Sequence, residues 1–107
     1  MLPDLAFIAQ PTRQQILRLI WESERSAGDI AEAVPVTFGA VSQHLGALRK
    51  AGLVRLRREG RMHWYAAERE AFGALGPALE EMWFGKLGEL KRLAEAEQRR
   101  IDRAKTN

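Results

Sequence analysis

The sequence predicts a small, mainly helical domain with one β-hairpin, in the order helix, helix, helix, helix, hairpin, helix. Apolar residues recur at spacings of three and four along most of the chain, alternate over residues 53–66, and then return to the helical spacing. Glycine and proline stand where one pattern gives way to the next. The length of 107 residues suits one domain, so we expect residues 1–107 to fold as a single unit.

Two helices are expected at the N-terminus. Residues 4–9 carry apolar side chains at nearly helical spacing behind Pro3, a residue that is favoured in a first helical turn. Thr12 is a good N-cap for a second helix. The apolar stripe of this second helix is wide enough to hold the core, and consists of Ile16, Leu17, Leu19, Ile20 and Trp21.

The next two helices are joined by a tight turn. Ser26, with Asp29 three residues later, resembles a capping box and opens a helix over residues 27–33, which Pro35 stops. Thr37 opens a helix over residues 37–51, and Gly52 stands where a helix C-terminus favours glycine. Two helices in this arrangement are typical of a helix-turn-helix. The inward face of the second is predicted to consist of Val41, Leu45 and Leu48.

A hairpin and a long helix complete the chain. Residues 53–66 alternate as two strands of a hairpin, or wing, around the basic segment 57–61, and residues 68–74 resemble a helical turn. After Gly76 and Pro77, apolar residues predict one continuous helix over residues 77–103. About 25 residues at 1.5 Å each give roughly 37 Å, which overhangs so small a domain.

This overhang predicts that the last helix is covered by a second copy of the chain rather than only by its own domain. Gly85 and Gly88 weaken a helix, but small residues on one side let another helix approach closely. We therefore expect a homodimer. The residues expected at its interface are Leu5, Leu79, Met82, Trp83, Leu87 and Leu90.

Composition excludes several classes of function. The chain has no cysteine, which removes thiolate nucleophiles and thiolate metal sites and suits a reducing cytoplasm. It shows no signal peptide and no apolar run of membrane-spanning length. His44 and His63, the two histidines, lack metal-ligand spacing, and no nucleophile-base pair or phosphate-binding loop is present. We expect a soluble cytoplasmic protein with no catalytic residues, no cofactor and no metal.

The positive charge is concentrated in the middle of the chain. The net charge is +3, but residues 37–66 hold six basic residues and one acidic residue, whereas the segments on either side are acidic or neutral overall. A local positive patch attracts a polyanion more effectively than an average charge does. A solvated basic surface without a partner is the alternative interpretation.

The outward face of the helix over residues 37–51 favours DNA recognition. Its small side chains would let the helix approach base edges, and Gln43 can pair bidentately with adenine. Ser42 suits a phosphate or backbone contact, and Thr37 can serve as N-cap, as phosphate contact, or as both. Arg49 and Lys50 either contact phosphates or complement the helix dipole. The candidate DNA-binding residues of this helix are Thr37, Phe38, Ala40, Ser42, Gln43, His44, Arg49 and Lys50.

Three arginines extend the candidate DNA-binding surface onto the wing. Arg57, Arg58 and Arg61 lie within five residues, so we expect them to repel one another and to stabilise nothing within the isolated chain. Contact with phosphates would relieve that repulsion and make DNA binding strongly salt-dependent. His63 is expected to be a surface residue on the second strand, facing away from the side on which Trp64 packs.

These segments resemble the ArsR-type winged helix-turn-helix repressors. The resemblance rests on residues 36–45 and 48–54, extends to the wing at residues 57–61 and 64–65, and is looser over residues 11–17. It implies a homodimer joined by terminal helices that binds operator DNA near its own gene and is released by a signal. The positions that match the family's DNA-reading helix are Thr37, Ala40, Ser42, Gln43 and His44.

The chain departs from the metal-sensing members of that family. Their cysteine pair is absent from the helix that reads Asp29-Ile30-Ala31-Glu32-Ala33 here, and the last helix has no histidine. Residues 81–84 instead resemble metal-independent members, and the sequence identifies no small-molecule inducer. The sequence thus predicts a homodimeric, sequence-specific DNA-binding regulator, an autoregulatory repressor on an imperfect palindromic operator. The alternative is a winged-helix module that binds other proteins.

Overall fold

The structure is a computed structural model that describes residues 3–105, except for the side chains of residues 86–89. Contacts between residues divide the chain into two compact units, Met1–Ala74 and Leu75–Asn107.

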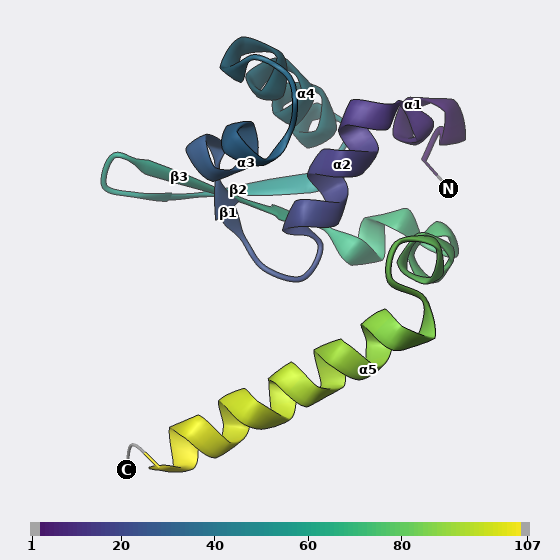
Figure 1. The fold of residues 1–107 in the computed structure, drawn as a ribbon. Helices are drawn as coiled ribbons and strands as arrows, with labels where there is room; N and C mark the ends of the chain where they lie inside the picture. The colour runs from purple at the N-terminus through teal and green to yellow at the C-terminus, as the bar shows by residue number, and fades with distance from the viewer. Residues whose placement is uncertain (1–2, 106–107) are drawn as a thin grey trace. The chain divides into compact units, whose positions relative to one another are not determined.

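The first unit holds four helices, a small sheet and a 3₁₀ turn, which confirms the predicted mainly helical class and its order of elements. In Figure 1, α3 and α4 lie above the sheet and the hairpin of β2 and β3 projects to the left. The elements are α1 (Leu5–Ala9), α2 (Pro11–Ile20), β1 (Arg25–Ser26), α3 (Ala27–Ala33), α4 (Phe38–Lys50), β2 (Val54–Glu59), β3 (Met62–Ala67) and the 3₁₀ helix η1 (Arg69–Phe72).

The sheet has three antiparallel strands in the order β1, β3, β2, and β1 was not predicted. The strand β1 consists of two residues, which are too few for an alternating pattern. Its Ser26 pairs with Trp64 of β3. The hairpin turns at Gly60, whose φ of 59° lies in the left-handed region that glycine adopts without strain. β1 therefore secures one edge of β3 and leaves the far part of the hairpin free to project.

The core of the first unit forms where α2, α3 and α4 pack with the base of the hairpin. Trp21 meets Phe72 edge to face with ring centroids 4.9 Å apart, so the end of α2 is packed against η1. The predicted inward residues of α2 and α4 are buried, except that Leu19 is half-buried. The fully buried large side chains include Ile16, Leu17, Ile20, Ile30, Val41, Leu45, Leu48 and Leu53.

The helix caps agree with the sequence prediction at one helix and differ at another. Ser26 Oγ accepts a hydrogen bond from the Asp29 backbone N–H at 3.1 Å, as predicted for α3. The prediction that Thr12 caps α2 is wrong. Gln10 is the cap, because its side-chain oxygen accepts from the Arg13 backbone N–H at 2.8 Å and Pro11 occupies the first helical position.

The second unit contains α5 (Leu75–Lys105), which is not the continuous helix expected over residues 77–103. Gly85 has φ 57° and ψ −164°, so the helix is broken there into two arms. A glycine reaches this conformation without the steric cost that a Cβ would impose. Arg92 lies 3.6 Å from Glu80 and 5.5 Å from the Phe84 ring centroid, and so links the arms across the break. None of the described helices has the length and apolar composition of a membrane span.

Candidate nucleic-acid interface

α4 is fixed at both ends by local hydrogen bonds. Thr37 Oγ1 accepts from the Ala40 backbone N–H at 3.1 Å, which confirms the predicted cap. At the other end, Gly52 adopts φ 79°, and the backbone N–H groups of Gly52 and Leu53 donate to Arg49 and Leu48 carbonyls at 2.9 and 3.0 Å. These bonds satisfy carbonyls that the helix end would leave unpaired. The helix spans Phe38–Lys50, and each end lies within one residue of the predicted range 37–51.

One face of α4 is buried and the opposite face is open. Val41, Leu45 and Leu48 are buried in the core. Gln43 is exposed and lies on the side opposite to these residues, with Gly39 and Gly46 one helical turn before and after it. A Cβ placed on Gly46 would meet no atom within 4 Å. The backbone around Gln43 is therefore accessible to a partner surface.

The other candidate residues of α4 surround Gln43 with different exposures. Phe38, at the first position of the helix, is 58% exposed. Ser42, Arg49 and Lys50 are exposed as well. Ala40 and His44 are half-buried.

His44 has a partner that sequence reasoning missed. Arg13 Nε–H donates to His44 Nδ1 at 3.3 Å, and Arg13 Nη1–H donates to the Phe7 carbonyl at 3.1 Å. Burial, and then the positive charge of Arg13, lower the pKa of His44 from its ordinary value. The imidazole is therefore neutral at pH 7. The two residues are 31 positions apart, and no local sequence signal pairs them.

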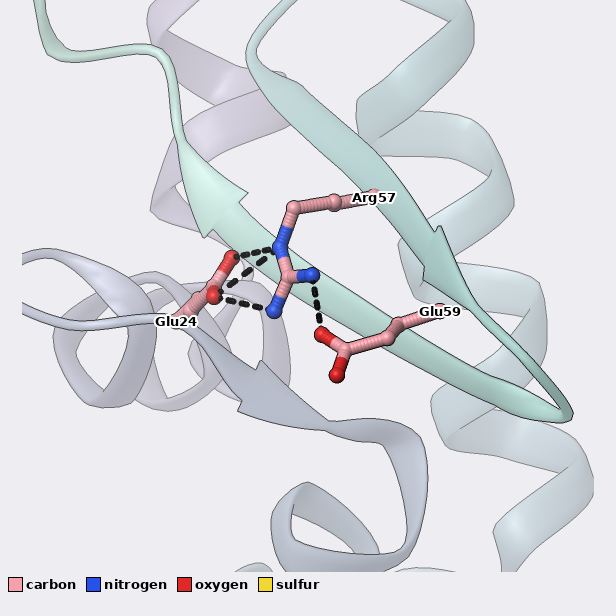
Figure 2. Close-up of polar contacts among 3 residues, drawn as sticks. All are labelled: Glu24, Arg57 and Glu59. Atoms are coloured by element: carbon pink, nitrogen blue, oxygen red, sulfur yellow. Dashed lines mark hydrogen bonds and ion pairs between the residues drawn. The ribbon is translucent and has the colours of Figure 1, made fainter.

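Arg57 is held by two carboxylates rather than standing free on the wing, as Figure 2 shows. Its Nε lies 3.1 and 3.2 Å from the two carboxylate oxygens of Glu24, and its Nη2 lies 2.7 Å from Oε1. Its Nη1 donates to Glu59 on the same strand. These hydrogen bonds raise the pKa of Arg57 and lower that of Glu24. The expectation that all three wing arginines stabilise nothing within the chain is wrong for Arg57.

Arg58 and Arg61 differ from Arg57 in both direction and partners. Adjacent residues on a strand point to opposite faces, so Arg58 lies on the face opposite to Arg57, across from His63. Arg61 follows Gly60 in the turn. Both arginines are exposed, and no carboxylate of the described residues forms an ion pair with either. Their charges are available to an external anion.

The residues expected at a dimer interface fall into several groups. Leu5 in the first unit is 61% exposed, and Met82 and Leu90 in the second are 60% and 63% exposed. Trp83 is half-buried, whereas Leu79 is 8% exposed and already buried. Leu87 lies outside the described side chains. Leu93, at 61% exposure, was not among the predicted interface residues although it continues the apolar spacing.

No cluster suitable for a metal ion occurs in the described part of the chain. Among those residues, no three histidine or acidic side chains come together as potential ligands. The polar groups of the candidate surface are helix backbone, amide, hydroxyl and cationic groups. Groups of this kind pair with base edges and phosphates.

The chain is similar to known bacterial regulatory proteins. Residues 10–55 match the family model described as bacterial regulatory protein, arsR family. The chain is 32% identical over 97 residues to the HTH-type transcriptional regulator Rv2034 of Mycobacterium tuberculosis, covering 89% of this chain and 91% of that protein. It is 43% identical over 63 residues to the regulator KmtR of the same organism, covering 59% of this chain but only 48% of KmtR.

A solved structure with a similar fold is the homodimeric winged helix-turn-helix DNA-binding domain of Mb0332 from Mycobacterium bovis, a possible ArsR-family transcriptional regulator. It aligns with a TM-score of 0.63 at 32% identity, over 72% of this chain and 71% of that one. The aligned structures share the arrangement of a winged helix-turn-helix. The matched segments cover 48%, 66% and 53% of the length of the first three curated relatives.

Proposed function

The chain belongs to the arsR family of bacterial regulatory proteins, and on this premise we propose that it is a homodimer that binds operator DNA sequence-specifically and represses transcription. In this proposal α4 enters the major groove, where Gln43 reads a base edge. The wing lies along the sugar-phosphate backbone. The observation that carries the proposal is the open face of α4, on which Gln43 stands between two glycines opposite the buried residues.

The wing supplies affinity in this account. Arg58 and Arg61 contact phosphates, while Arg57 keeps its intramolecular role. Arg49 and Lys50 extend the cationic surface from the last turn of α4. Phosphate contacts position a protein on DNA but carry no sequence information, so the choice of operator falls to α4.

The exposed apolar residues and one structural relative support dimerisation. Met82 and Leu90 place large apolar side chains in solvent, and a second copy of the chain would bury them. The domain of Mb0332 is named as homodimeric. Two recognition helices in a symmetric dimer read two half-sites about one helical turn apart, which gives an imperfect palindrome. A protein bound to its own promoter obstructs the polymerase, which makes it an autoregulatory repressor.

Fluorescence anisotropy tests the proposal. The full chain is titrated into a labelled duplex taken from the region upstream of its own coding sequence and into a scrambled duplex of the same composition. We expect tighter binding to the upstream duplex and loss of that preference in Gln43→Ala. Gln98→Ala, on α5, is the matched control and keeps the preference. Equal binding to both duplexes, together with capture of a specific protein partner, favours a protein-binding module instead.

A further inference from the structure

Arg13 connects the candidate recognition helix to the two helices before it. Its guanidinium donates from Nε to His44 Nδ1 on α4 at 3.3 Å and from Nη1 to the carbonyl of Phe7 on α1 at 3.1 Å. The same guanidinium lies 4.1 Å from the centroid of the Phe7 ring. One side chain on α2 therefore has defined contacts with α1 and α4, and its orientation does not depend on His44 alone.

The direction of the hydrogen bond determines where the imidazole proton lies. An arginine side chain has only donors, so His44 Nδ1 must act as the acceptor and carry no proton. A neutral imidazole then holds its proton on Nε2. A doubly protonated ring would place two cations against each other with no acceptor between them. Among the described residues, Arg13 is the charged side chain in contact with His44.

We propose that Arg13 is a positioning residue that holds His44 as the neutral Nε2–H tautomer, so that α4 presents a single fixed N–H donor to an acceptor on the DNA. This inference rests on the proposed function, because it takes α4 as the helix that meets DNA. His44 is half-buried and belongs to the same helix as Gln43, whose outward face lies open. Burial and the charge of Arg13 also lower the pKa of His44, which favours the neutral ring.

The proposal has two measurable consequences. The first is spectroscopic: His44 in the wild-type chain shows Nε2–H as its neutral tautomer and titrates below the ordinary value of 6.5. The second concerns binding. Because its pKa is lowered, His44 contributes less pH dependence to DNA affinity between about pH 6 and 7.5 than an unperturbed histidine, which titrates over that range.

Nitrogen-15 NMR of the imidazole rings tests the first consequence without DNA. The chain has two histidines, and a His63→Gln variant assigns the remaining signal to His44. In Arg13→Ala we expect the pKa of His44 to rise, because the positive charge beside it is removed, and both neutral tautomers to appear. Arg13→Gln keeps an N–H donor without the charge, so it retains the Nε2–H tautomer with a raised pKa. Arg18→Ala, an exposed change on the same helix, is the matched control.

Anisotropy with the upstream duplex tests the second consequence. We expect Arg13→Ala and Arg13→Gln to gain affinity several-fold as the pH falls from 7.5 to 6, because His44 then acquires a charge, whereas Arg18→Ala keeps the pH profile of the wild type. A wild-type Nδ1–H tautomer, or Arg13 variants with an unchanged pKa and pH profile, would overturn the inference. If the wild-type chain prefers no duplex, the proposed function fails, and the NMR result still decides whether Arg13 fixes the tautomer.

Discussion

Replacing Arg58 with alanine is expected to make DNA binding less sensitive to salt by an amount that follows from the structure. Arg58 is exposed and has no carboxylate partner among the described residues, so its full charge is available to a phosphate. Each phosphate neutralised on duplex DNA contributes about 0.9 to the slope of log affinity against log salt. A homodimer has two copies, so the variant should lose about 1.8 from that slope. The ratio of wild-type affinity to Arg58→Ala affinity for the duplex should therefore fall by roughly twelve-fold between 50 and 200 mM salt.

Arg57→Ala is the comparison that makes the prediction specific. Arg57 is one residue away, but the carboxylates of Glu24 and Glu59 already offset its charge and occupy its N–H donors. Its loss should leave the salt slope within error of the wild type. Both slopes are measured by anisotropy at four or more salt concentrations. Thermal unfolding of Arg58→Ala checks that its stability stays within about 0.5 kcal/mol, as expected for an unpaired surface residue.

Two results would contradict a phosphate contact by Arg58 alone. One is an Arg58→Ala slope equal to that of the wild type, which would remove the wing from the DNA contact. The other is a loss of slope in Arg57→Ala as large as in Arg58→Ala, which would mean that the contacts with Glu24 and Glu59 give way to phosphate contacts on binding.

Further predictions concern stability, assembly and pH. Gly46→Ala should stabilise the chain by up to about 1 kcal/mol, because the added Cβ meets open space on a helix. Gly85→Ala should destabilise it by roughly 1–3 kcal/mol, because φ 57° with ψ −164° is a conformation that only glycine adopts readily. Chemical unfolding measures both. Met82→Glu should shift the dimer to monomer in sedimentation equilibrium, with Gln98→Glu as a control of equal charge, and an unaltered dimer would remove Met82 from the interface. The pKa of Glu24 is lowered by its arginine partner, so its stabilisation is complete above the ordinary value of 4.5 and is lost as pH falls through the lowered pKa. Glu24→Gln should therefore be less stable than the wild type at pH 7, and should lose less stability on acidification below pH 4.5, as followed by circular dichroism.

The helix-turn-helix could be predicted from the sequence because its signals are local. Thr37 and Gly52 mark the ends of α4, and the spacing of Val41, Leu45 and Leu48 determines which face enters the core. Capping and helical periodicity each depend on residues within a few positions of one another. The exposed position of Gln43 follows from the same periodicity.

The features that were missed depend on residues distant in the sequence or on competing local choices. The Glu24–Arg57 pair spans 33 positions and exists because β1 aligns beside β3. At α2, Gln10 is the N-cap and Pro11 is the first helical residue, so the helix begins before Thr12. At Gly85 the apolar spacing continues on both sides, so periodicity alone predicts an unbroken helix. A glycine inside such a pattern is compatible with either outcome.

The most direct test of sequence-specific recognition by α4 is selection of bound sequences from a library of random duplexes of about 30 base pairs by the whole chain, with Gln43→Ala in parallel. We expect the wild type to enrich an imperfect palindrome whose half-sites are centred about 10 base pairs apart, and the variant to lose the preference at the position that Gln43 reads in each half-site. A folded wild-type protein that enriches no sequence over the starting library would contradict this expectation.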